Sequence, residues 1–179
     1  MRNKTQITMK TLCLTTLIAV FLLLGTFKIQ AQNPQTKLDQ VELMKQLLGN
    51  WKGELAKDTI MIMNWTSYGK ASEDNYKVVT KDKILYSRKA IYGYDQKYDK
   101  IVAAAITDNS PNIDLMAIWF SSKDTANLVG YQYLANPEKS NFKMQCIFIQ
   151  SDSFKRIVIY NNKVESVSTF LREKNEQSH

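Results

Sequence analysis

The hydrophobic pattern changes from a helical period to a strand period near residue 49. Between Leu38 and Leu48 the apolar residues recur at spacings of three and four, which predicts an amphipathic helix of about three turns. Gly49 follows and is expected to end this helix. After Trp51 apolar and polar residues alternate, as in a sheet with one face in water. The pattern therefore predicts one short helix followed by strands.

The strand period continues almost to the end of the chain, interrupted by short polar turns. The predicted strands cover residues 51–55, 59–66, 76–80, 83–94, 101–107, 113–121, 126–134, 141–150, 154–160 and 164–172. Asn161-Asn162 fits a tight hairpin, and residues 108–112 have strong turn chemistry. Such a meander can end as an open sheet, a sandwich or a barrel. Because closure removes exposed edges, we expect an all-β fold, an antiparallel up-and-down β-barrel of about 8–10 strands with a short N-terminal leader helix.

The first 31 residues differ from the rest in composition. Basic residues at positions 2, 4 and 10 precede an apolar run over 11–27, and Ala31 is small. This pattern is typical of a secretory signal peptide cleaved after Ala31. An uncleaved anchor is the alternative, because the apolar run is at the lower limit of a bilayer span. We expect a signal peptide at 1–31, a polar tether at 32–37, a barrel domain at 38–172 and a polar tail at 173–179.

The leader also determines how the charge is interpreted. The formal net charge is +7, from 24 basic and 17 acidic residues, but four basic residues and no acidic ones lie in residues 1–31. The remaining chain has an excess of only three positive charges, spread along its length. No nucleic-acid surface is predicted. The leader predicts a secreted or periplasmic bacterial protein with no membrane span after cleavage.

Few residues are suited to catalysis. His179, the sole histidine, is the last residue, which argues against Ser-His-Asp and Cys-His catalysis and against a multi-histidine metal site. Cys146 alternates with Met144 and Phe148 and is expected to be buried. No catalytic residue, metal or cofactor is predicted. An enzyme would have to work without histidine.

Several short motifs resemble a known superfamily. The helix is followed by Gly49-x-Trp51-x-Gly53, residues 93–95 read Gly-Tyr-Asp, and Arg172 ends the last predicted strand. With these motifs residues 38–172 resemble the calycin superfamily, the lipocalin-like β-barrels, and most of all a secreted bacterial branch with a Leu-Leu-Gly-x-Trp-x-Gly opening. The resemblance implies that Trp51 closes one end of the barrel and that Arg172 packs on its ring, a structural role.

Two arginines lie inside predicted strands and carry the ligand hypothesis. Arg88 alternates with two tyrosines, and Arg156 alternates with Phe154 and Tyr160. If these faces line the barrel, the guanidinium groups could hold an anionic head group, an arrangement similar to that of fatty-acid-binding calycins. Alternatively, either arginine faces solvent or pairs with an internal acid such as Glu165. The candidate ligand-binding residues are Arg88, Arg156, Tyr86, Tyr92, Tyr160 and Trp119.

Whether the interior is hollow is left open by the sequence. Large aromatic and methionine side chains could fill it, whereas the run Ala103-Ala104-Ala105 leaves space. The first expectation is binding of a small hydrophobic or amphipathic ligand. The second is a structural or interaction module of the cell envelope with a packed interior, and the third is a histidine-independent enzyme. No protein partner can be named.

Overall fold

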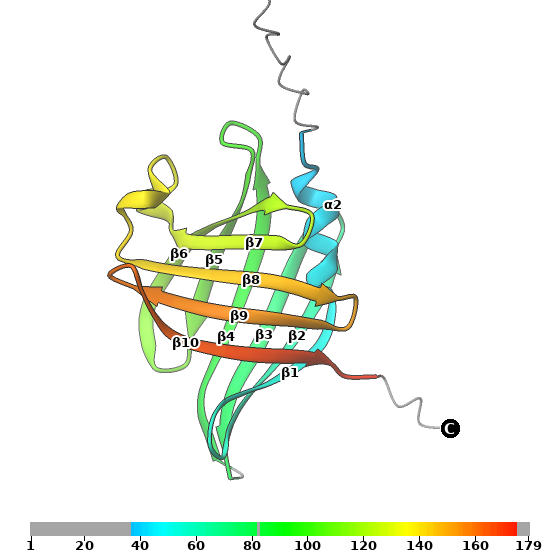
Figure 1. The fold of residues 1–179 in the computed structure, drawn as a ribbon, viewed down its shortest axis with the longest axis vertical. Coiled ribbons are helices and arrows are strands. Elements are labelled where there is room, and N and C mark those ends of the chain that lie inside the picture. Colours follow the sequence, from blue (N-terminus) through cyan, green and yellow to red (C-terminus); the bar gives the residue numbers. More distant parts are fainter. Residues whose placement is uncertain (1–36, 82, 175–179) are drawn as a thin grey trace, which may run out of the picture. The chain divides into compact units, whose positions relative to one another are not determined.

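The computed structural model describes residues 37–81 and 83–174. In this part of the chain ten antiparallel strands form a closed barrel, in which each strand pairs with the next and the last pairs with the first (Figure 1). This confirms the predicted fold class. The strands are β1 (Gly49–Ala56), β2 (Thr59–Tyr68), β3 (Ala71–Thr80), β4 (Lys83–Asp95), β5 (Lys100–Thr107), β6 (Ser110–Ser122), β7 (Thr125–Gly130), β8 (Phe142–Gln150), β9 (Ser153–Tyr160) and β10 (Lys163–Arg172).

The predicted leader helix is present but short. It consists of α2 (Gln40–Met44) and a 3-10 turn, η1 (Lys45–Leu47). Asp39 caps it, because its side chain accepts a hydrogen bond of 2.9 Å from the backbone N–H of Glu42. Gly49 directly follows the C-cap residue Leu48, as expected of a glycine that ends a helix, and with φ at +117° it also begins β1. The helix lies beside the β6–β7 turn (Figure 1), and the Gln40 amide both donates to and accepts from the backbone of Phe120 at 3.2 and 2.7 Å.

Two strand boundaries differ from the prediction by four residues or more. β3 begins at Ala71 rather than at residue 76, although residues 71–75 are mostly poor strand formers. Its pairing with β2 runs without interruption from Thr80 to Ala71, so sheet contacts override the local preference. β7 ends at Gly130, and the expected continuation is a 3-10 turn, η2 (Tyr131–Tyr133), followed by η3 (Pro137–Lys139).

The β9–β10 hairpin follows its sequence signal. Asn161 and Asn162 both have positive φ, 49° and 61°. Two consecutive residues of this kind make the tight turn whose twist matches that of the flanking strands. Asparagine tolerates this conformation better than most residues, which is why the pair was a turn signal.

Aromatic rings fill the part of the barrel interior around Trp51. The Trp51 and Phe154 rings are 4.8 Å apart, and the Phe154 and Phe170 rings stack at 4.9 Å. The Trp51 indole donates to the Leu47 carbonyl at 2.7 Å, which joins these rings to the helical segment. Gly53 lies against Phe170, where a Cβ atom would be 2.7 Å from the ring. This region is a packed core.

Some expectations lie outside the described residues. These are the signal peptide, most of the tether and residues 175–179 of the tail. In the part of the chain that the structure describes, no helix is long and apolar enough to cross a bilayer.

Candidate functional site

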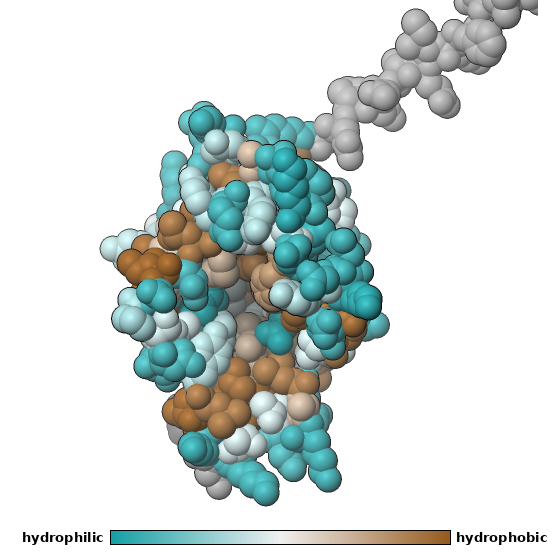
Figure 2. Space-filling model, turned by 90° about the vertical axis from the view of Figure 1, so that its left-hand side faces the viewer, coloured by the Kyte–Doolittle hydropathy of each residue, from teal (hydrophilic) through white to brown (hydrophobic). Residues whose placement is uncertain are grey.

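An internal cavity of about 340 Å³ lies within the barrel beside the aromatic packing, and Phe154 belongs to both. Its walls come from the inward faces of several strands and include both Arg88 and Arg156. Phe142 and Asp114 also line it and are exposed to solvent, so the cavity reaches the surface. Figure 2 shows that one face of the molecule is hollowed and that apolar side chains gather around the hollow. The interior is therefore filled in one part and open in another.

Four of the predicted ligand residues meet at this cavity. Arg88, Tyr86 and Tyr92 reach it from β4, and Arg156 reaches it from β9. Alternation along each strand places these side chains on the inner face. Tyr160 does not line the cavity and is 50% exposed.

Trp119 lies on the outer face of the barrel, contrary to its expected place in the interior. It packs on the small apolar cluster of Ala117, Val129 and Leu134, with the Lys100 amine 4.7 Å from its ring. Residues 116, 118 and 120 of β6 face inward, so Trp119 must face outward. The structure gives Trp119 no contact with the cavity.

Arg88 has an internal acid partner. Its Nη1 is 3.4 Å from Oδ2 of Asp74, and the same oxygen accepts a 2.7 Å hydrogen bond from the Tyr92 hydroxyl. Burial raises the pKa of Asp74, whereas Arg88 and Tyr92 act in the opposite direction. The arginine–acid pair left open by the sequence is thus Arg88 with Asp74. Glu165, the acid suggested for it, is exposed on β10.

Arg156 has no such partner. Among the described residues no carboxylate forms an ion pair with it. Its Nη1 is 3.2 Å from the Met61 sulfur, its guanidinium carbon is 5.4 Å from the centre of the Phe170 ring, and its Nε is buried without a hydrogen-bond partner. Burial lowers the pKa of Arg156, but a guanidinium remains protonated in proteins. An uncompensated positive charge therefore faces the cavity.

Cys146 is the cross-strand neighbour of Arg156 and also lines the cavity. Burial raises the pKa of its thiol to about 12. The thiolate is the reactive form of cysteine, so Cys146 is a poor nucleophile at neutral pH. Within residues 37–81 and 83–174, no three His, Cys, Asp or Glu side chains lie close enough together to hold a metal ion.

Among the cavity residues that were not predicted as ligand residues are Asp74, Tyr76 and Trp65. The Tyr76 and Tyr86 hydroxyls are hydrogen-bonded to each other, and the Tyr76 ring lies 5.2 Å from the Arg88 guanidinium carbon. Asp74 could have been predicted as a cavity residue, because it is two residues from Tyr76 in β3 and so lies on the same face of the strand. The prediction began that strand at residue 76 and so left Asp74 outside it.

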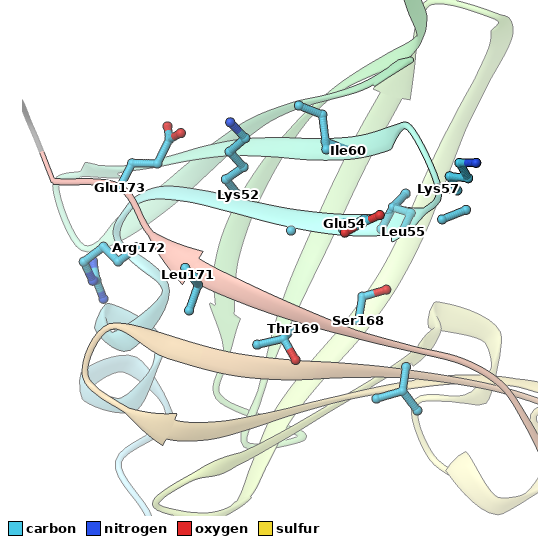
Figure 3. A pocket seen from close by; sticks show the side chains of 13 residues that line it. Lys52, Glu54, Leu55, Lys57, Ile60, Ser168, Thr169, Leu171, Arg172 and Glu173 are labelled. Atoms are coloured by element: carbon cyan, nitrogen blue, oxygen red, sulfur yellow. The ribbon is translucent and has the colours of Figure 1, made fainter. Parts of the chain in front are cut away.

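A second depression lies on the outside of the barrel at the junction of β1 and β10. Between described residues these strands pair at only three positions, the last being Gly53 with Phe170, and then diverge. Figure 3 shows the resulting groove, with Glu54 and Leu55 on one side and Ser168 and Thr169 on the other. Most of its lining side chains are exposed, and opposite charges are mixed along it. Among the described residues that line it, none carries a half-buried, unpaired charge comparable to that of Arg156.

Arg172 stands at the paired end of this junction. Its guanidinium carbon is 4.2 Å from the centre of the Trp51 ring, in the arrangement that the resemblance implies. It also donates to the backbone carbonyls of Gln46 at 3.0 Å, of Ser151 at 3.1 Å and of Leu48. Among the described residues its hydrogen bonds are all with backbone carbonyls, which is the pattern expected of a structural residue.

Comparison with known proteins does not assign the chain to a family. No protein-family model matches the chain, and no curated protein matches it. The functional argument therefore rests on the barrel and the internal cavity.

Proposed function

We propose that this protein is a secreted or periplasmic lipocalin-like barrel of the calycin superfamily, which binds a small amphipathic molecule with an anionic end. The closed barrel, the Gly-x-Trp opening and the stacking of Arg172 on Trp51 support the superfamily. The composition of residues 1–31 supports export.

The observation that carries the ligand proposal is the unpartnered charge of Arg156. A buried charge is costly unless it is paired and hydrogen-bonded. The remaining groups around it, Met61 and the Phe170 ring, provide only weak interactions. A ligand carboxylate would neutralise the guanidinium and accept its N–H donors, in a bidentate manner where the geometry allows. The anionic end of the ligand therefore binds at Arg156, whereas Arg88 is already neutralised by Asp74.

The cavity also limits the size of the ligand. At about 340 Å³ it is at the lower end of the usual range of ligand pockets, roughly 300–1,000 Å³. Apart from the polar groups its lining is mostly apolar and includes Met61, Met63 and Met144. Methionine side chains are flexible and adapt to irregular apolar shapes. A medium-length aliphatic carboxylate fits this space better than a long-chain lipid.

The proposal is tested by titrating delipidated protein with aliphatic carboxylates of increasing length and with the matching neutral alcohols, using calorimetry. We expect saturable binding of the carboxylates, and at least about a tenfold loss of affinity in Arg156→Met, which is about 1.4 kcal/mol. Lys155→Met is the matched control, because Lys155 is the exposed neighbour on the same strand. If no carboxylate binds, or if Arg156→Met and Lys155→Met bind equally well, the proposal is wrong.

A further inference from the structure

Besides Nε of Arg156, the cavity contains two polar atoms without partners among the described residues, one on β2 and one on β3. Nε1 of Trp65 and Oδ1 of Asp74 are both buried, and neither has a hydrogen-bond partner among the described residues. The two residues face each other across the strands, line the cavity and are 7% and 1% exposed. A buried polar group without a partner is costly, so this pair requires a physical explanation.

The neighbouring residues fix the position of both groups. The other oxygen of Asp74, Oδ2, is held by Tyr92 and Arg88, and the backbone of Ala90 also favours the ionised carboxyl group, whereas Oδ1 has no hydrogen bond of normal geometry. The Trp65 ring packs on the Tyr92 ring with 4.4 Å between their centres. Tyr92 in turn lies opposite Ala103, and this small residue leaves room for the two rings. The indole N–H and the carboxylate oxygen are therefore a rigid donor and acceptor on neighbouring strands.

This pair lies at a different depth in the barrel from Arg156. Arg156 contacts Met61, whereas Trp65 is four residues further along β2. At about 3.3 Å per residue, the two backbone positions are on the order of 13 Å apart. One ligand of medium length can therefore reach both.

From these observations we infer that Trp65 and Asp74 form a second polar subsite, which binds a neutral group that both donates and accepts hydrogen bonds, such as a hydroxyl or a carboxamide. The inference rests on the proposed function, because it concerns the far end of the same ligand. A hydroxyl accepts from the Trp65 indole and donates to Asp74 Oδ1. A methyl group does neither, and a second carboxylate has no proton to donate to Asp74. The ligand is then an aliphatic carboxylate with a polar neutral terminus.

The test compares aliphatic carboxylates with their ω-hydroxy counterparts, over chains of about six to twelve carbons, of which the longest span a separation of about 13 Å. We expect the best ω-hydroxy acid to bind wild-type protein at least about tenfold more tightly than the plain acid, because a site built for a hydroxyl rejects the analogue without one. Trp65→Phe keeps an aromatic ring and removes the N–H. It should reduce this preference several-fold, measured as the ratio of the affinities of the two acids for the same variant, so that a general effect on the cavity cancels. Trp119→Phe is the matched control, because Trp119 lies outside the barrel.

A direct measurement uses the indole N–H resonances of the three tryptophans. The Trp65 signal, assigned from Trp65→Phe, should move further with the ω-hydroxy acid than with the plain acid. The Trp51 signal should move little, because its N–H is bonded to Leu47. The inference is overturned if plain and hydroxylated acids bind wild type equally at every length, or if Trp65→Phe leaves the preference intact. Binding of neither acid would instead refute the proposed function.

Discussion

The guanidinium of Arg172 lies over the Trp51 ring and donates hydrogen bonds to the chain just before it, at the backbone carbonyls of Gln46 and Leu48. One side chain from the last strand thus holds the helical segment and the first strand. The contact stands where the barrel closes, beside the short pairing of β1 with β10. We therefore expect Arg172 to contribute to barrel closure at this junction in addition to the backbone pairing.

Replacing Arg172 should weaken the fold. Arg172→Ala removes the stacking and the charged hydrogen bonds, and we expect a loss of about 2–4 kcal/mol in the free energy of unfolding. Arg172→Lys keeps the charge but cannot reach all the carbonyls at once, so it should recover only part of this loss. Urea denaturation followed by tryptophan fluorescence measures both. Equal stability of Arg172→Ala and wild type would show that the contact is not needed for closure.

Two glycines offer a matched test of packing around Phe170. A Cβ at Gly53 would lie 2.7 Å from the Phe170 ring, whereas nothing lies within 4 Å of a Cβ at Gly93. Gly53→Ala should therefore cost about 1–3 kcal/mol of unfolding free energy through overpacking. Gly93→Ala should be neutral or slightly stabilising. Thermal melts of both variants distinguish a local clash from a general effect of glycine replacement, which would lower both melting temperatures alike.

The contribution of Asp74 to the free energy of unfolding should fall as the pH rises. Burial raises the pKa of Asp74 in the folded protein, so the folded state keeps this proton to a higher pH than the unfolded chain does. The stability from this group is complete below the ordinary pKa and is lost as the pH rises toward the raised value. Asp74→Asn cannot ionise, so it should gain stability relative to wild type from about pH 4 upward. If the stability of Asp74→Asn relative to wild type instead falls as the pH rises, the pairing with Arg88 outweighs the effect of burial.

Cys146 should react slowly in the folded protein. Because burial raises its thiol pKa to about 12, little thiolate is present near neutral pH. Alkylation of Cys146 by iodoacetamide at pH 8, followed by peptide mass spectrometry, should be much slower than in urea-unfolded protein. If the folded and unfolded rates are the same, the thiol is accessible and the cavity is more open than described.

Much of the fold could be predicted from local patterns. The change of period near residue 49 indicates a helix followed by strands, and the Asn161-Asn162 turn follows from side chains that tolerate positive φ. Alternation also placed Arg88 and Arg156 on the same faces as their neighbouring aromatics, and these faces line the cavity.

Other features depend on contacts between strands that are distant in sequence. In β6 both faces are apolar, so alternation alone could not show that Trp119 is outside and that residues 118 and 120 are inside. The start of β3 depended on pairing with β2, and this pairing is what brings Asp74 into the barrel beside Trp65.

The sequence by itself determined the spacing of the hydrophobic residues and the positions of several turns, because these depend on residues close together along the chain. The scarcity of reactive side chains follows from the composition. Only the tertiary structure decided which arginine is neutralised and where the interior is hollow. Arg88 meets Asp74 across β3 and β4, whereas Arg156 faces the Met61 sulfur, the Phe170 ring and the cavity and has no acid partner among the described residues. Strand register and barrel closure determine these contacts, and a local pattern contains neither.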